Sequence, residues 1–67
     1  MKLKVNGDSV EVPNTVKTVA ELLQYFELHH KLVIVEKNAE IVEKEKHQET
    51  LLVDEDKIEL VHFVGGG

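Results

Sequence analysis

Apolar and polar positions alternate with a period of two through the first dozen residues. The apolar members of this pattern are Met1, Leu3, Val5, Val10 and Val12. Such alternation is typical of half-buried strands, so we expect strands over residues 1–5 and 9–12. Between them, Asn6-Gly7 is a strong signal for a tight hairpin, because both residues tolerate positive φ. Pro13 follows the second strand and ends it, since proline has no backbone N–H for a ladder.

The apolar period changes to that of a helix over residues 18–28. One stripe at helical spacing contains Val19, Leu22, Leu23 and Phe26. Thr18 and Glu21 have the spacing of a capping box, which predicts where the helix begins. Eleven residues form a marginal helix alone, so we expect this one to pack on a sheet. Residues 29–31, His-His-Lys, are expected in its last turn, where donor groups suit the helix dipole.

The second half of the chain alternates short apolar runs with polar segments. We expect strands at residues 32–35, 41–42 and 57–64, a turn at 37–40, a charged solvated loop at 43–49 and a return to the core at 51–53. Several strands with one helix predict an α+β protein. The order of elements matches a β-grasp (ubiquitin-like) arrangement, a mixed sheet of four to five strands packed on one main helix. We expect this domain over residues 1–64 and a flexible glycine tail over residues 65–67.

The amino-acid composition of the chain argues against several classes of function. The chain has 67 residues and a mass of 7.6 kDa, with 8 lysines, no arginine, 13 acidic residues and a net charge of −5. An acidic chain is a poor candidate for binding nucleic acid or an anionic membrane surface. No apolar run approaches a membrane span and no signal peptide is recognisable, so we expect a cytoplasmic protein. The absence of cysteine excludes disulfides and thiolate chemistry.

The histidines and carboxylates do not form a convincing catalytic or metal pattern. His29 and His30 are adjacent, so on a helix their side chains diverge, and His47 and His62 lie elsewhere in the chain. We therefore expect no metal site, and we interpret the histidines as solvated or capping residues. Ser9 has no His–Asp neighbour in the sequence that would make it a nucleophile. At this size a binding or carrier role is favoured over a catalytic one.

The sequence ends in three glycines directly after the last predicted strand. Gly65, Gly66 and Gly67 have no Cβ, so they can form a thin thread about 10 Å long that enters a narrow channel of a partner. The α-carboxylate of Gly67 would then be the unusual reactive group of the molecule. A carboxylate is a poor electrophile until a partner supplies a leaving group, for example through an adenylate made from ATP.

Four segments carry a resemblance that covers nearly the whole chain. They are residues 3–7 (LKVNG), 18–23 (TVAELL), 33–38 (VIVEKN) and 56–67 (DKIELVHFVGGG). With these segments the chain resembles the ubiquitin-like sulfur carriers, and within them the ThiS family of the thiamine pathway. Many members have a Pro-Arg pair and a tryptophan after the fourth strand. Here residues 43–48 read EKEKHQ, so the resemblance assigns no role to this loop.

The resemblance implies a reaction sequence carried out by partners. A ThiF-type activating enzyme uses Mg-ATP to adenylate the carboxylate of Gly67. Sulfur drawn from cysteine through a desulfurase replaces AMP and leaves a thiocarboxylate, and thiazole synthase (ThiG) uses that sulfur to build the thiazole of thiamine. The carrier would bind no cofactor of its own, would not be an enzyme, and is expected to be a monomer when free.

Recognition by these partners is expected from the open face of the sheet. If Ile58 and Leu60 face the helix, then Glu59, Val61 and Phe63 face outward. Leu32 and Ile34 join them if Val33 and Val35 point inward. An exposed apolar patch of this kind usually marks a partner site.

Three other functions remain open at the level of sequence. A molybdopterin-type sulfur carrier shares the fold and the tail, although a third terminal glycine favours the thiazole pathway. A ubiquitin-like modifier would join Gly67 to lysine side chains of other proteins. A plain interaction domain would lose nothing on deletion of Gly66 and Gly67.

Overall fold

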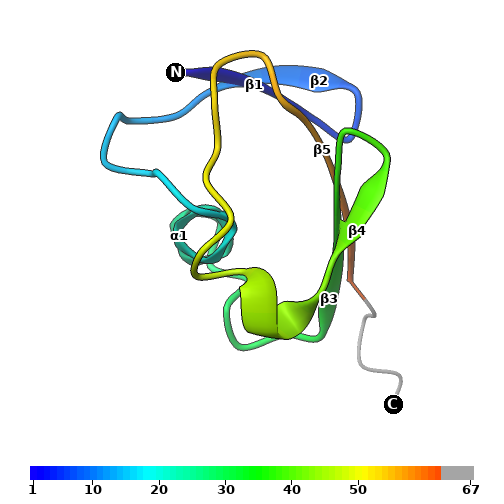
Figure 1. Ribbon diagram of the computed structural model, residues 1–67. Coiled ribbons are helices and arrows are strands. Elements are labelled where there is room, and N and C mark those ends of the chain that lie inside the picture. The colour runs from blue at the N-terminus through cyan, green and yellow to red at the C-terminus, as the bar shows by residue number, and fades with distance from the viewer. Residues whose placement is uncertain (63–67) are drawn as a thin grey trace.

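The computed structural model describes residues 1–62 of the chain, and its elements form one sheet with a helix on one face (Figure 1). Along the chain these elements are β1 (Lys2–Val5), β2 (Asp8–Glu11), α1 (Val19–Tyr25), β3 (Val33–Lys37), β4 (Glu40–Val42), the 3₁₀ turn η1 (Lys44–Lys46) and β5 (Lys57–His62). The predicted residues Phe63, Gly65, Gly66 and Gly67 lie outside the described part, so their placement stays a prediction.

The sheet is mixed, with the strand order β2-β1-β5-β3-β4. β5 lies in the middle, parallel to β1 and antiparallel to β3, and the outer strands β2 and β4 belong to hairpins. α1 and the segment that follows η1 lie on the same side of the sheet, and within residues 1–62 no helix or loop covers the other side (Figure 1). This arrangement confirms the expected α+β fold of several strands on one main helix.

The core lies between α1 and the covered face of the sheet. Its fully buried side chains are Leu3, Val19, Leu22, Val35 and Ile58. The alternation predicted for the last strand is confirmed, because Ile58 and Leu60 point inward while Glu59 and Val61 are exposed. Of the expected return segment 51–53, only Leu52 reaches the core.

Both hairpins use tight turns with positive φ at their two central residues. Asn6 has φ 50° and Gly7 has φ 88°, as the Asn-Gly signal predicts. Asn38 has φ 52°, and Ala39 has φ 73° in spite of the steric cost of its Cβ. The second turn therefore has the geometry of the first without its glycine.

The helix begins where the sequence predicts but ends earlier. Its capping box at Thr18 is formed, yet the predicted end at residue 28 is wrong, because α1 stops at Tyr25. Glu27 adopts φ 60°, and the N–H of Leu28 turns back to donate to the carbonyl of Leu23 at 2.7 Å. This is the left-handed helix ending that usually employs glycine. Residues 29–31 lie beyond it, so they do not occupy the last turn as expected.

Of the solvated and capping roles expected for the histidines, the solvated role is wrong for His47, which is the C-cap residue of η1. Its side chain is only 8% exposed, and its Nε2 lies 3.0 Å from the carbonyl oxygen of Val42. Its own carbonyl accepts a hydrogen bond from the N–H of Ala20 at 2.9 Å. His47 thus connects the end of β4 to the first turn of α1, although it belongs to segment 43–49, which was expected to be a charged, solvated loop.

Candidate functional site

The described part of the predicted site lies on the uncovered face of β3 and β5. Ile34 is paired directly with Val61 in the antiparallel register, and Glu59 is paired with Glu36 one step along the same face. Ile34 is 42% exposed and Val61 is 53% exposed. The structure therefore brings together Ile34, Glu59 and Val61, three described residues of the predicted partner surface. β5 runs through this surface.

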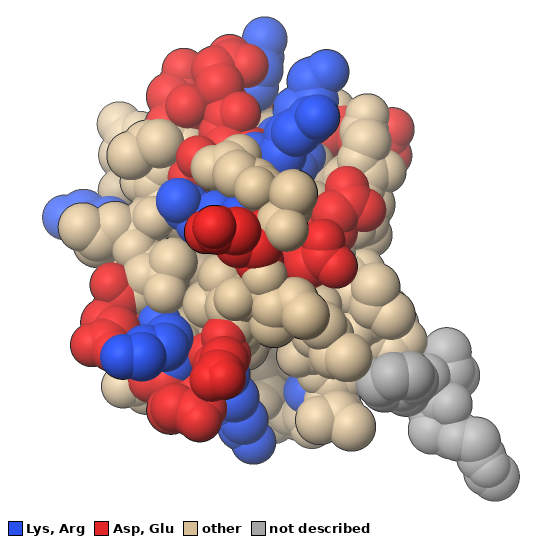
Figure 2. Space-filling model, turned by 45° about the vertical axis from the view of Figure 1, so that its right-hand side comes forward, with Lys and Arg blue, Asp and Glu red and all other residues tan. Residues whose placement is uncertain are grey.

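Ile41 and Glu36 extend this surface toward the edge of the sheet. Ile41 of β4 lies opposite Glu36 of β3 and is 66% exposed. Sequence analysis missed both residues, because the face that each strand presents depends on the register of pairing. Figure 2 shows acidic groups and lysines interspersed with uncharged surface on the side of the molecule that is turned forward there. We call Ile34, Glu36, Ile41, Glu59 and Val61 together the outer patch.

Two asparagines of the hairpin turns hold β5 in place. The amide oxygen of Asn6 accepts a hydrogen bond from the N–H of Leu60 at 2.7 Å, and its amide nitrogen donates to the carbonyl of Leu60 at 3.2 Å. The amide oxygen of Asn38 accepts from the N–H of Lys57 at 3.0 Å. Each asparagine thus supports a turn and fixes the strand that leads to the predicted tail.

Asp56 adds a second support at the start of β5. Its Oδ1 accepts a hydrogen bond from the side chain of Asn38 at 3.0 Å, and its Oδ2 accepts from the N–H of Val53 at 2.9 Å. The ammonium of Lys37 lies 3.6 Å from the same Oδ2. Asp56 is only 5% exposed, and these partners compensate the burial of its carboxylate. The position and direction of β5 are therefore fixed before the strand reaches the outer patch.

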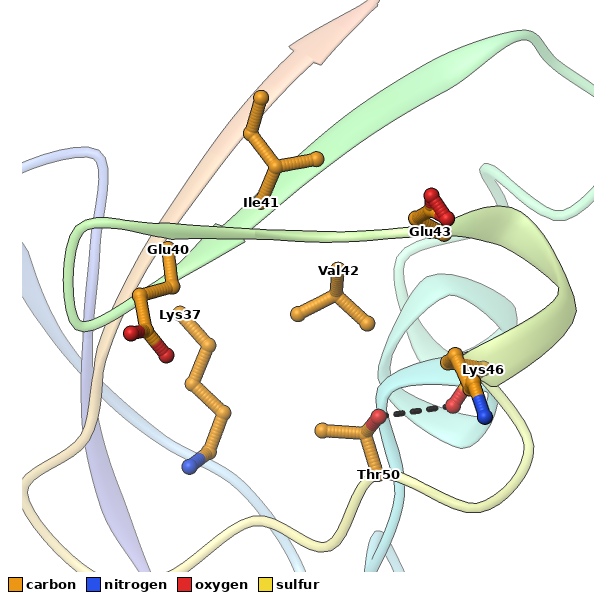
Figure 3. A pocket seen from close by; sticks show the side chains of 7 residues that line it. All are labelled: Lys37, Glu40, Ile41, Val42, Glu43, Lys46 and Thr50. Atoms are coloured by element: carbon orange, nitrogen blue, oxygen red, sulfur yellow. Dashed lines mark hydrogen bonds between the residues drawn. The ribbon is translucent and has the colours of Figure 1, made fainter.

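A shallow pocket of about 350 Å³ lies between β4, η1 and Thr50 (Figure 3). The hydroxyl of Thr50 donates to the carbonyl of Lys46 at 2.7 Å, and the ammonium of Lys46 lies 3.4 Å from the carboxylate of Glu49. Lys37, also on the pocket wall, is engaged by Asp56. Its polar groups thus serve the local fold, and no nucleophile lies beside a general base there.

Metal and membrane features are absent from the part of the chain that the structure describes. Residues 1–62 contain no group of three or more His, Asp or Glu side chains placed to hold a metal ion. The rings of His29 and His30 lie 3.8 Å apart, in a turn beyond α1 and not on a helix as expected. Among the same residues, no helix has both the length and the apolar character needed to cross a bilayer.

Comparisons with known proteins agree with this fold over the whole chain. A crystal structure of the thiamine biosynthesis protein ThiS from Geobacter metallireducens superposes with a TM-score of 0.82 and 36% identity, over 100% of both chains. A solution structure of a thiamine biosynthesis protein from the same organism gives a TM-score of 0.83 over 100% of this chain and 88% of that one, again at 36% identity. The β-grasp fold is thereby confirmed.

Sequence comparisons extend the agreement beyond the fold. The sulfur carrier protein ThiS of Bacillus subtilis is 48% identical over 65 residues, which cover 97% of this chain and 98% of that protein. A thiazole synthase of Paramagnetospirillum magneticum is 39% identical over 67 residues, all of this chain but 20% of the synthase. The sequence profile of the ThiS family matches residues 2–67. The chain therefore belongs to the ThiS family.

Proposed function

We propose that this protein is a sulfur carrier of thiamine biosynthesis, which holds its sulfur as a thiocarboxylate on Gly67. The observation that carries the proposal is the match of the ThiS family to residues 2–67, a range that includes the three glycines. The Bacillus subtilis relative, a sulfur carrier protein, supports it at 48% identity over nearly its full length.

The proposed chemistry uses one carboxylate and needs no catalytic group on the carrier. An oxygen of the Gly67 carboxylate attacks the α-phosphorus of ATP, and pyrophosphate leaves. The terminal sulfur of a persulfide derived from cysteine then attacks the acyl carbon, and AMP leaves. A thiol attacks the other sulfur of the resulting acyl disulfide, which forms a new disulfide and releases the thiocarboxylate. ATP and Mg²⁺ are bound by the activating enzyme in this scheme, and the carrier acts as its co-substrate.

Thiazole synthase (ThiG) is the proposed acceptor of the sulfur. The synthase of Paramagnetospirillum magneticum supports this partner, because a segment similar to this entire chain makes up 20% of that protein. A carrier-like segment within a synthase indicates that the two act together. The ThiF-type activating enzyme and the cysteine-derived sulfur donor follow from the family resemblance, and the cytoplasm is the expected location.

Intact-mass analysis tests the function directly. After incubation with the activating enzyme of the same organism, ATP and a sulfur source, we expect the chain to gain the mass difference between a sulfur and an oxygen atom. The gain should require ATP, and it should disappear on deletion of Gly67. An unchanged mass under conditions where the enzyme consumes ATP would contradict the proposal.

Partner recognition is assigned to Ile34, Glu59, Val61 and Phe63. We predict that Val61→Asp and Phe63→Ala leave the fold intact and lower kcat/KM of adenylation by about ten-fold or more, because a charge or a cavity replaces an apolar contact. Val53→Asp is a matched control: Val53 is 59% exposed, like Val61, but lies before β5. Equal losses in Val61→Asp and Val53→Asp would argue against this surface.

A further inference from the structure

The outer patch contains two carboxylates that face each other, and the nearest lysine on the same face of β5 is the exposed Lys57, two residues before Glu59. Glu36 and Glu59 are directly paired across β3 and β5, and this register places their Cβ atoms about 4.5–5.5 Å apart. Within residues 1–62, the ion pairs of the chain involve other carboxylates, so neither glutamate forms an ion pair with Lys57 or another lysine there. Like charges in this position destabilise a sheet. Their placement is therefore a cost to the free protein.

Apolar side chains flank the carboxylate pair on two sides of the same face. Ile41 of β4 lies beside Glu36, on the side of β3 that is away from Glu59. The pair of Ile34 and Val61 lies about 7 Å from the carboxylate pair along the strands. All three side chains are exposed at the surface of the described chain. A partner that covers this face must therefore supply apolar groups and, between them, a positive charge.

We infer that the outer patch docks on a partner surface that places an arginine side chain between Glu36 and Glu59, with apolar groups over Ile34, Ile41 and Val61. This inference rests on the proposed function, because the partner is identified with the activating enzyme. A guanidinium presents several N–H donors in one plane and can bond both carboxylates at once, whereas an ammonium acts as a compact point charge. The negative charge of Glu36 and Glu59 thus favours an arginine of the partner at this position.

The variant Glu36→Lys should change the stability of the free chain and its binding to the partner in opposite directions. In the free chain it replaces a like-charge pair by an opposite-charge pair, so the urea midpoint should rise. In the complex it opposes a partner arginine, so the dissociation constant for the activating enzyme should rise about ten-fold or more. Glu59→Lys should behave in the same way. Glu45→Lys changes the same charge on η1, and this control should leave binding within about two-fold of the unmodified chain.

Calorimetric binding and intact mass, measured on the same samples, distinguish the two proposals. Unchanged binding of Glu36→Lys, or an equal loss in Glu45→Lys, would overturn the docking inference even if the unmodified chain gains sulfur. Weaker binding of the outer-patch variants alone would support it even if no sulfur is gained, and the proposed function would then fail by itself. A loss of binding together with a lower urea midpoint would also overturn the inference, because it would assign the glutamates a structural role.

Discussion

Ala39 is the residue whose backbone conformation conflicts most clearly with its side chain. Its φ of 73° costs an L-residue about 1–2 kcal/mol, and glycine has no such cost. We predict that Ala39→Gly raises the free energy of unfolding by about 0.5–1 kcal/mol, after the larger chain entropy of glycine is subtracted. Urea denaturation measures the difference. Ala20→Gly, the same substitution inside α1, should lower stability instead.

At Asn6 the sequence predicts the local backbone conformation but not the hydrogen bonds of the side chain. Asn-Gly predicts the turn, because positive φ is a property of the two residues themselves. The two hydrogen bonds from Asn6 to Leu60 join residues 54 positions apart, so they depend on the completed sheet. His47 is a similar case, since its burial depends on where β4 and α1 meet. Local conformation was predictable here, and long-range contacts of polar side chains were not.

At the scale of elements, α1 was predicted better at its start than at its end. The N-terminal capping box involves residues three positions apart, and Thr18 and Glu21 provide it in the sequence. The end depends on Glu27 accepting a left-handed conformation, which the residue type disfavours. The strands were predicted within a few residues, because alternation reports burial. The pairing of Glu36 with Glu59 was not, since alternation contains no information on register.

The capping box makes part of the stability of α1 depend on pH. Hydrogen bonds from the backbone N–H of Lys17, at 2.8 Å, and of Thr18 lower the pKa of Glu21 from its ordinary value of 4.5. A lowered pKa means that the folded state favours the carboxylate. The contribution is therefore complete above pH 4.5 and is lost as the pH falls through the lower folded value.

We predict that the stability difference between the unmodified chain and Glu21→Gln is constant near neutral pH and shrinks below pH 4.5. Glutamine keeps an oxygen acceptor for the capping box but does not titrate, so it isolates the contribution of the charge. Urea denaturation over a series of pH values measures this difference. A difference that grows on acidification, or that does not change with pH, would contradict the assignment.

At the scale of the whole molecule, the sheet and the outer patch form a rigid base for the chemistry proposed at Gly67. β5 is held by β1 and β3 and by the side chains of Asn6, Asn38 and Asp56. The fold class followed from the sequence because the apolar pattern specifies one helix and several strands. The glycines themselves indicated a thin thread whose carboxylate a partner must activate. The sulfur chemistry came from the family resemblance, because a carboxylate that reacts only in a partner leaves no catalytic pattern in its own chain.

The boundary between the domain and the predicted tail can be tested by truncation. The buried apolar side chains of the described chain lie between Leu3 and Leu60. We therefore predict that a chain ending at Val64 unfolds within about 0.5 kcal/mol of the full chain in urea, although it can no longer gain sulfur. A chain ending at Leu60 loses the pairing of Val61 and His62 with β3 and should be clearly less stable. Should removal of residues 65–67 lower stability as much as that longer truncation, the glycines would belong to the folded domain and the proposed boundary at residue 64 would be wrong.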